Sequence, residues 1–238
     1  MMNQDSISLN KFISSTGICS RREADKWIEA GRVAINGQKA VKGNRVNHGD
    51  KVTIDGRPLK VRDQPVYLLF HKPPGVTTTT DRRDKDNIID FIGYKKRIFP
   101  IGRLDKASSG LIIMTNDGDM VNKILRKENQ HEKEYIVKVN KLITKQFISR
   151  MSKPIPMLGT RTLPAKVFQL NAQLFKIILI QGLNRQIRRM CEYCGYKVIS
   201  LKRIRIMHLE LGDLRPGQWR EMSKEELKLL NHRLDGIQ

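Results

Sequence analysis

Near the start of the chain, apolar residues recur at helical spacing in two successive stretches. Leu9, Phe12 and Ile13 fall on one helical stripe, and a glycine follows where such a short helix would end. A second stretch begins after Ser20, which opens a Ser-Arg-Arg-Glu sequence with the pattern of a capping box, and it ends at Gly31. The pattern therefore predicts two short helices in tandem.

The residues after these helices form short runs that are typical of strands. Runs at 33–35, 45–46 and 51–54 are separated by Asn-Gly, His-Gly-Asp and Asp-Gly sequences, which are characteristic of tight turns. We therefore expect a small β-sheet to follow the helix pair and to form one compact unit with it.

A polar segment at 60–65, which ends in proline, is the best candidate for a linker. We place a domain boundary within it, with a small domain at residues 1–62 and a larger domain at residues 63–238. The chain has 238 residues, which is enough for both domains to bury a core.

The larger domain mixes strand-like and helical runs, and they do not alternate regularly as in a doubly wound α/β fold. The expected fold class is therefore α+β, with a mixed or largely antiparallel sheet. The strand-like runs lie at 66–70, 111–115, 134–139 and 175–180, and the helical runs lie at 119–126, 145–151, 186–194 and 223–234.

The charge balance indicates the class of partner. The chain carries 45 Lys and Arg against 24 Asp and Glu, a net charge of +21, and 39% of its residues are hydrophobic. A globular protein with so strong a positive field attracts polyanions, and the candidates are RNA, DNA or an anionic membrane. The sequence has no apolar run of membrane-spanning length and no signal peptide, so we expect a cytoplasmic protein that does not bind membranes. The three cysteines are too few to predict disulfides.

Six basic residues gather on the predicted helix pair and the residues that follow it. A basic face of this kind can follow a phosphate backbone, although scattered Lys and Arg also solvate ordinary surfaces. The sequence around the six residues, over about residues 7–57, resembles the S4 RNA-binding domain, which favours RNA binding. The six residues are Lys11, Arg21, Arg22, Lys26, Arg32 and Lys39.

A second group of charges surrounds Asp105, in the sequence Gly-Arg-Leu-Asp-Lys-Ala-Ser-Ser-Gly-Leu at 102–111. Arg103 and Lys106 are close in sequence, and positive charge nearby favours the ionised form of the carboxyl group. An oriented carboxylate can act as a nucleophile or a base. For the spacing alone, a surface salt bridge is the more common explanation, since most such pairs are structural.

A strand turns into a helix at 181–190, in the sequence Gln-Gly-Leu-Asn-Arg-Gln-Ile-Arg-Arg-Met. Arg188 flanks the apolar stripe of this helix and can reach inward to a carboxylate, whereas Arg185 and Arg189 face the polyanion. The alternative is an amphipathic helix with a solvated basic face. Cys191 and Cys194 share the apolar stripe, which favours core packing over a metal or redox role.

Tyr135 and Lys72 each have a structural and a functional interpretation. Tyr135 alternates with valines on one face of a predicted strand, so it is either a core aromatic or a ring that stacks on an extruded base. Lys72 opens a Lys-Pro-Pro-Gly sequence, which by itself predicts a turn.

Taken in order, the motifs at 72–75, 102–111, 133–135, 181–190 and 214–220 resemble the RsuA-type branch of the pseudouridine synthases. The resemblance implies an RNA pseudouridine synthase, an isomerase that needs no cofactor and no metal. It implies that Asp105 attacks C1′ of an everted uridine or assists elimination to a glycal, that Arg188 pairs with Asp105, and that Tyr135 stacks on the base. It further implies that Arg103 braces the place of the flipped nucleotide. Lys72 and Arg185 would shape the site or contact phosphate.

The same resemblance implies a uridine in a stem-loop of 23S ribosomal RNA near the peptidyl-transferase region, and a tRNA anticodon uridine as a second target. We expect a monomer. The alternative is a non-catalytic RNA-binding protein of the S4 type. The two interpretations differ in a testable way, because only the enzyme requires Asp105, Tyr135 and Arg188 to converge in one cleft.

Overall fold

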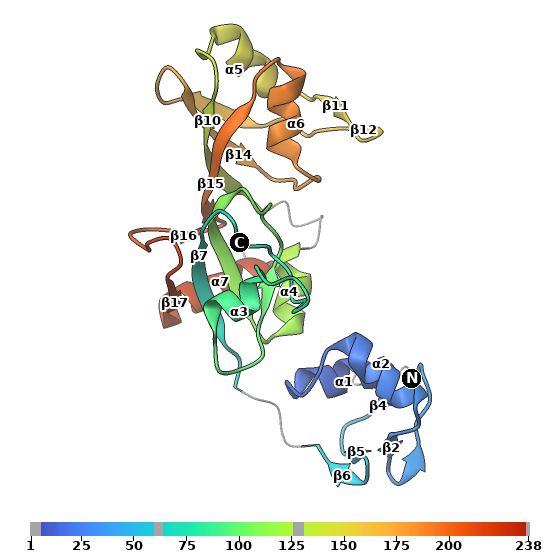
Figure 1. Ribbon diagram of the computed structural model, residues 1–238. Coiled ribbons are helices and arrows are strands. Elements are labelled where there is room, and N and C mark those ends of the chain that lie inside the picture. Colours follow the sequence, from blue (N-terminus) through green and yellow to red (C-terminus); the bar gives the residue numbers. More distant parts are fainter. Residues whose placement is uncertain (1–5, 60–63, 126–130, 237–238) are drawn as a thin grey trace. The chain divides into compact units, whose positions relative to one another are not determined.

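The computed structural model describes residues 6–59, 64–125 and 131–236. The chain divides into two compact units, drawn in Figure 1. The smaller unit comprises Met1–Pro65, with Lys95–Arg97 and Asn116–Gly118, and the remaining residues form the larger unit. The predicted boundary between residues 62 and 63, and most of the predicted linker, lie outside the described residues.

The small unit begins with the two predicted helices. α1 spans Leu9–Ser15 and α2 spans Arg21–Glu29. The Ser20 hydroxyl accepts a hydrogen bond from the Glu23 amide (3.1 Å), which gives α2 the N-cap that its sequence predicts. Apolar residues from both helices and from the adjacent strands form a single buried core.

Two small antiparallel sheets complete this unit. One has the strand order β3-β2-β5-β6, and the other pairs β1 with β4. Asn36 and Gly37, between β2 and β3, have positive φ angles of 51° and 81°, which a tight hairpin turn requires. The predicted turn chemistry is therefore confirmed here. The strands are β1 (Ile7–Ser8), β2 (Val33–Ile35), β3 (Gln38–Lys39), β4 (Arg45–Val46), β5 (Val52–Ile54) and β6 (Arg57–Pro58).

The larger unit is built on a nine-stranded mixed sheet, counted over the described residues. Its main path has the order β13-β14-β10-β15-β9-β7-β17, with β16 paired to β15 and β8 paired to β9. Only β9 and β15 pair in parallel among these described strands. The strands are β7 (Tyr67–Lys72), β8 (Phe99–Ile101), β9 (Ser109–Thr115), β10 (Lys133–Val139), β13 (Lys166–Gln169), β14 (Leu174–Leu179), β15 (Val198–Ile206), β16 (Leu209–Glu210) and β17 (Trp219–Glu221).

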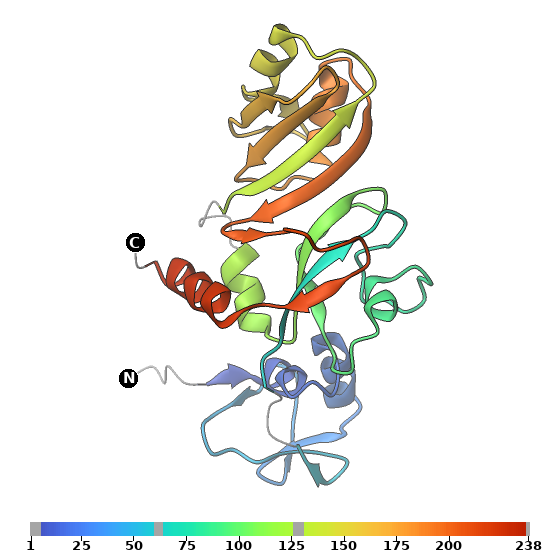
Figure 2. The same ribbon diagram turned by 90° about the vertical axis from the view of Figure 1, so that its left-hand side faces the viewer.

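Helices cover both faces of this sheet (Figure 2). α4 and α7 share one buried core with Leu69 of β7, whereas α3, α5 and α6 share the other core with Leu68 and Phe70 of the same strand. β7 and β9 are buried on both faces, which explains why they appear in the sequence as continuous apolar runs. The α+β class and the mixed sheet are confirmed. The helices are α3 (Ile88–Ile92), α4 (Gly118–Leu125), α5 (Lys145–Met151), α6 (Gln186–Tyr193) and α7 (Lys224–Leu234), and a separate hairpin pairs β11 (Pro156–Met157) with β12 (Thr160–Arg161).

Strand β15 is a major element that the sequence pattern did not predict. Opposite it on β10, Glu134 pairs with Arg205 and Tyr135 pairs with Arg203, so Ile204 is an extra residue that forms a β-bulge. An extra residue reverses the alternation of side chains between the two faces. Arg205 accordingly forms an ion pair with Glu134 on one face, and Arg203 shares the opposite face with Tyr135.

β9 and β15 join the two halves of the sheet along a short seam. Their parallel register contains Ser109 opposite Lys202 and Gly110 opposite Arg203. Gly110 has a φ of +114°, and a Cβ atom at this position would overlap the backbone of Arg203. Glycine is therefore required for the two strands to approach this closely.

Candidate active site

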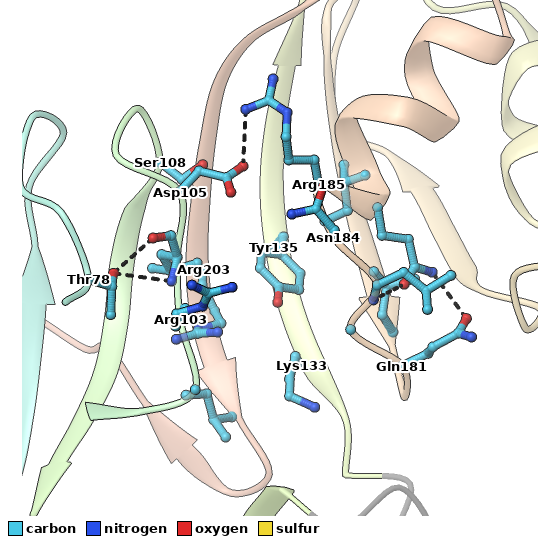
Figure 3. Close-up of a pocket in the computed structure, with 18 of the residues that line it drawn as sticks. Thr78, Arg103, Asp105, Ser108, Lys133, Tyr135, Gln181, Asn184, Arg185 and Arg203 are labelled. Carbon is cyan, nitrogen blue, oxygen red and sulfur yellow. Dashed lines mark hydrogen bonds and ion pairs between the residues drawn. The ribbon is translucent and has the colours of Figure 1, made fainter. Parts of the chain in front are cut away.

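A cavity of about 840 Å³ lies in the larger unit, next to this seam (Figure 3). The loop between β8 and β9, the strands β10 and β15, and the loop that leads into α6 all contribute to its walls. Asp105, Tyr135 and Arg188 all line it, although they are far apart in the sequence. The three side chains therefore meet in one cavity, which the enzyme interpretation requires and the interpretation as a non-catalytic RNA-binding protein does not.

Asp105 lies in the β8–β9 loop, with its side chain 32% exposed. Its Oδ2 atom is 3.6 Å from Nη1 of Arg185 and 3.6 Å from Nε of Arg188. The expectation that Lys106 flanks this carboxylate is wrong, because Lys106 forms its ion pair with Asp86 instead (2.6 Å). The carboxylate is held by residues far away in sequence and not by its sequence neighbours.

The first turn of α6 carries both arginines. Arg188 is only 11% exposed, and its Nη2 atom donates a hydrogen bond to the hydroxyl of Ser108 (3.2 Å). Arg185 is the N-cap residue and adopts a left-handed conformation, with a φ of 50°, which is uncommon for a residue with a side chain. Arg185 was expected to shape the site or contact phosphate, and it also lies beside Asp105. Arg189 donates to the carbonyl of Asn184.

The end of β7 and the turn that follows it, residues 72–75, support the Asp105 loop. Lys72 is completely buried (0% exposed), and its Nζ atom donates to the carbonyls of Pro73 (2.8 Å), Lys106 (3.2 Å) and Ser108 (2.7 Å). Burial lowers the pKa of Lys72 to about 8, although the charge of Asp105 opposes this effect. This position supports the interpretation that Lys72 shapes the site.

Two further contacts fix the same loop. The amide of Gly75 donates to the carbonyl of Lys106 (2.8 Å). The hydroxyl of Thr78 donates to the carbonyl of Leu104 (2.8 Å) and accepts from the Leu104 amide (3.3 Å). Ser108 and Thr78 were not predicted as site residues. For Thr78 the available signal was its place in a run of four threonines shortly after the Lys-Pro-Pro-Gly turn.

Tyr135 lies on β10 and is 8% exposed, so its ring belongs both to the core and to the cavity wall. Two basic residues beside it were also missed from the sequence. Lys133 lines the cavity two residues earlier on β10, and Arg203 lines it from β15. Figure 3 shows Tyr135 between the Asp105 loop and the α6 side of the cavity, with Arg203 and Lys133 close to it. Arg103 also lines the cavity and is exposed.

The six basic residues predicted to bind RNA all lie in the small unit. Arg21, Arg22, Lys26 and Lys39 are exposed. Arg32 forms a two-pronged ion pair with Asp55, in which Nε is 3.0 Å from Oδ1. Its guanidinium carbon also lies 5.2 Å from the centre of the Trp27 ring. Arg32 therefore has a structural partner. Lys11 lies on α1 and is half-buried.

The described residues include no cluster of three or more His, Cys, Asp or Glu side chains suited to a metal ion. Cys191 is buried and Cys194 is half-buried on α6, and all three cysteines are free thiols. Burial raises the pKa of Cys19 to about 11 and also raises that of Cys191. Within residues 6–59, 64–125 and 131–236, no helix is both long and apolar enough to cross a membrane.

Comparison with known families agrees with this geometry. Residues 66–193 match the RNA pseudouridylate synthase family, and residues 8–52 match the S4 domain. The chain is 52% identical over 229 residues to the dual-specificity RNA pseudouridine synthase RluF of Salmonella typhi, which covers 95% of this chain and 79% of that protein. It is 36% identical to the ribosomal large subunit pseudouridine synthase B of Bacillus subtilis strain 168, covering 93% of this chain and 94% of that protein.

A solved structure has a similar fold over most of the chain. A crystal structure of a pseudouridylate synthase superimposes with a TM-score of 0.69 at 26% sequence identity, covering 94% of this chain and 99% of the other. This match extends over both units of the chain, so each has a counterpart in a known member of the family.

Proposed function

This chain belongs to the RNA pseudouridylate synthase family and carries an S4 domain ahead of the synthase domain, and from this premise we propose which residues isomerise uridine and in which RNAs. The reaction breaks the bond between N1 of uracil and C1′ of its ribose, turns the base, and rejoins it through C5. Asp105 starts the reaction, either as a nucleophile at C1′ or by assisting elimination to a glycal. The observation that carries this assignment is the pair of guanidinium groups 3.6 Å from Oδ2 of Asp105, at the wall of a cavity.

The two arginines aim the carboxylate, because both guanidinium groups lie 3.6 Å from the same oxygen atom, Oδ2. Arg188 is the better-positioned of the two, because its hydrogen bond to Ser108 ties it to the same loop as Asp105. Arg185 is more exposed (46%) and is therefore able to contact substrate phosphate as well.

Tyr135 receives the everted base. Its ring lines the cavity from the strand opposite the Asp105 loop, where it can stack on uracil and accept or relay the proton that leaves C5. Arg103 occupies the exposed side of the same loop and braces the space that the flipped nucleotide leaves. Flipping a base out of its stack costs a few kcal/mol, so a uridine in a loop is a better substrate than one in a regular duplex.

The RNA targets follow from the likeness to the dual-specificity relatives. We assign to this chain a uridine in a stem-loop of 23S ribosomal RNA near the peptidyl-transferase region, and a tRNA anticodon uridine as its second target. The exposed basic residues of the predicted N-terminal domain, residues 1–62, hold the RNA, and residues 63–238 carry out the reaction as a monomer in the cytoplasm. Exposed Lys and Arg bind phosphates without reading sequence, so the choice of uridine rests on the cavity and on the fold of the RNA.

Tritium release from RNA that contains 5-tritiated uridine tests the catalytic assignment. We expect Asp105→Asn to lower release at least about 10³-fold, as is typical when a nucleophile is removed, while RNA binding changes only a few-fold. Asp213→Asn removes an exposed carboxylate of the same unit and should leave release unchanged. Turnover by Asp105→Asn at the wild-type rate would remove Asp105 from the mechanism.

The targets are tested by mapping pseudouridine in cellular RNA. Carbodiimide modification followed by primer extension, in cells with and without the gene, should show one site lost from 23S ribosomal RNA and one from tRNA. Loss of a site in only one of the two RNAs would restrict the chain to a single class of substrate. Restoration by the wild-type protein but not by Asp105→Asn would link each lost site to the cavity.

A further inference from the structure

We infer that Lys133 and Arg203 form a cationic subsite in the cavity that binds a phosphodiester group beside the everted uridine. This subsite rests on the proposed function, because it is a part of the same cavity. It is separate from the Asp105 pair, since neither Lys133 nor Arg203 is among the ion-pair partners of Asp105.

The two side chains face the same space because of the β-bulge in β15. Ile204 is the extra residue opposite the step from Glu134 to Tyr135, and it places Arg203 on the face of β15 that shares the cavity with Lys133 and Tyr135. β-Bulges commonly redirect a side chain next to a functional site. Without the bulge, Arg203 would share the outer face with Arg205, which is already neutralised there by Glu132 and Glu134.

Arg203 is held in place but not fully paired. It is only 3% exposed, and its Nε atom donates to the carbonyl of Leu111 (2.7 Å). Its Nη2 atom is buried and has no hydrogen-bond partner among the described residues. A buried guanidinium donor without an acceptor is costly, so this atom is available for an acceptor that the substrate brings.

Lys133 supplies a second positive charge beside it. Its Nζ atom donates only to the carbonyl of His131 (3.2 Å) within the described part of the chain. Burial lowers the pKa of Lys133, and the charge of Arg203 lowers it further. The two cations therefore repel each other in a partly buried space, which a nearby negative charge would relieve.

The described part of the chain provides no such negative charge. Asp105 is the only carboxylate among the described residues that line the cavity, and it is engaged with Arg185 and Arg188. No carboxylate among the described residues lies within ion-pair distance of Lys133 or Arg203. We therefore expect the negative charge to come with the substrate.

A phosphodiester suits this site better than a carbonyl of the base. The phosphate is the charged group of RNA, and a guanidinium group matches the geometry of phosphate oxygens. A neutral uracil oxygen could accept one hydrogen bond from Arg203, but it would not neutralise two cations. A phosphate next to the flipped uridine would also fix the ribose, and so hold C1′ in register with Asp105.

A double-mutant cycle between protein and RNA tests the subsite. The probe is a synthetic stem-loop RNA with one uridine in its loop, made with a neutral methylphosphonate in place of the phosphate on either side of that uridine. We expect one of the two replacements to weaken equilibrium binding to the wild-type chain about tenfold, the usual scale of a charged hydrogen bond. The same replacement should have no further effect on Lys133→Gln, because the contact is already lost.

Lys138→Gln is the matched control, since it removes the same charge from the exposed face of the same strand. It should retain the full tenfold effect of the methylphosphonate. Lys133→Arg and Arg203→Lys keep the charge and should retain most of the effect, and thermal unfolding monitored by circular dichroism checks that each variant is folded. Equal effects of both methylphosphonates on the wild type and on Lys133→Gln would overturn the subsite and assign the two cations to the base or to the fold.

The same samples separate this inference from the proposed function. Release of tritium by the wild-type chain tests the enzyme, and the binding cycle tests the subsite. If the wild-type chain releases tritium, but the effects of the methylphosphonate and of Lys133→Gln on binding are additive, only the phosphate contact is overturned. An absence of release with a non-additive cycle would overturn the proposed function and leave an RNA phosphate site in place.

Discussion

The small unit and the synthase cavity both contain lysines and arginines, but in two different environments. Arg21, Arg22 and Lys26 are exposed on α2, where water already solvates their charges. Arg188 and Arg203 are largely buried, and each has a fixed partner in the Asp105 loop or on β9. Solvated charges give salt-dependent affinity that many RNAs can share, whereas buried charges act only on a group placed at one point.

The largest expected effect is on catalysis and concerns the buried arginines. Arg188→Gln should lower kcat about 10²-fold with little change in KM, because the carboxylate loses a guanidinium group that aims it at the reacting atoms. Single-turnover tritium release measures this effect. Arg189→Gln, the next residue on α6, is the control and should stay within about twofold. A rise in KM with an unchanged kcat would show that Arg188 binds RNA in the same manner as the exposed arginines.

The second effect is on stability. Lys72→Met removes the ammonium donor from the carbonyls of Pro73, Lys106 and Ser108, and only the Lys106 carbonyl keeps a second donor, the Gly75 amide, among the described contacts. We therefore expect the free energy of unfolding to fall by about 2 kcal/mol, together with a lower kcat. Urea denaturation measures the first and tritium release the second. Lys202→Met, at an exposed position of β15, should change neither. An equally stable Lys72→Met chain would show that the cost of burying the ammonium outweighs its three hydrogen bonds.

A third prediction concerns the exposed charges. The triple variant Arg21→Gln, Arg22→Gln and Lys26→Gln should reduce the slope of log affinity against log salt by about 2, because each phosphate contact contributes roughly 0.7 to 0.9. Filter binding over a range of salt concentrations measures it, and kcat at saturating RNA should be unchanged.

A charge-matched control for this variant comes from α7, where the exposed residues Lys224, Lys228 and Arg233 can be changed to Gln together. If both triple variants reduce the slope equally, the effect belongs to the net charge of +21, and the small unit has no special part in phosphate binding.

The smallest effect is on the pH dependence of stability. His71 is buried, and burial lowers its pKa from the ordinary value, although the hydrogen bond from its Nδ1 atom to the Leu214 carbonyl (2.6 Å) opposes the shift. The unfolded chain therefore binds a proton at a higher pH than the folded chain does, and stability falls as the pH drops through that interval. His71→Asn should remove this component of acid destabilisation. His48→Asn, at an exposed position of the small unit, should not alter the pH dependence.

Much of the fold could be predicted because local patterns and tertiary packing agree. The α1–α2 pair, the Asn36-Gly37 turn and the apolar strands β7 and β9 lie close to where the sequence pattern places them. β15 was missed for a physical reason. Its pairing with β10 shifts register at both Ile199 and Ile204, so the strand contains no long run of regular alternation. Arg203 was missed together with it.

The candidate site divides in the same way. Asp105, Tyr135 and Arg188 were accessible through motifs, because their chemistry depends on residue type. Other features depend on which segments meet in three dimensions. They are the partners of Asp105, the burial of Lys72 and the two hydrogen bonds between Thr78 and the Leu104 backbone. A lysine that is completely buried has the same sequence signature as one on the surface, so spacing alone could not distinguish the Lys72 ammonium from a phosphate contact.

The contact of Gly110 with the backbone of Arg203 has a consequence for how the gene can vary. Every other amino acid at position 110 would push apart the two strands that carry the acid loop and the buried arginine. Selection on this codon should therefore be as strict as on the codon for the acid itself, even though glycine brings no functional group. A survey of random variants scored by growth would see two equally intolerant positions, one intolerant for its chemistry and the other for its lack of a side chain.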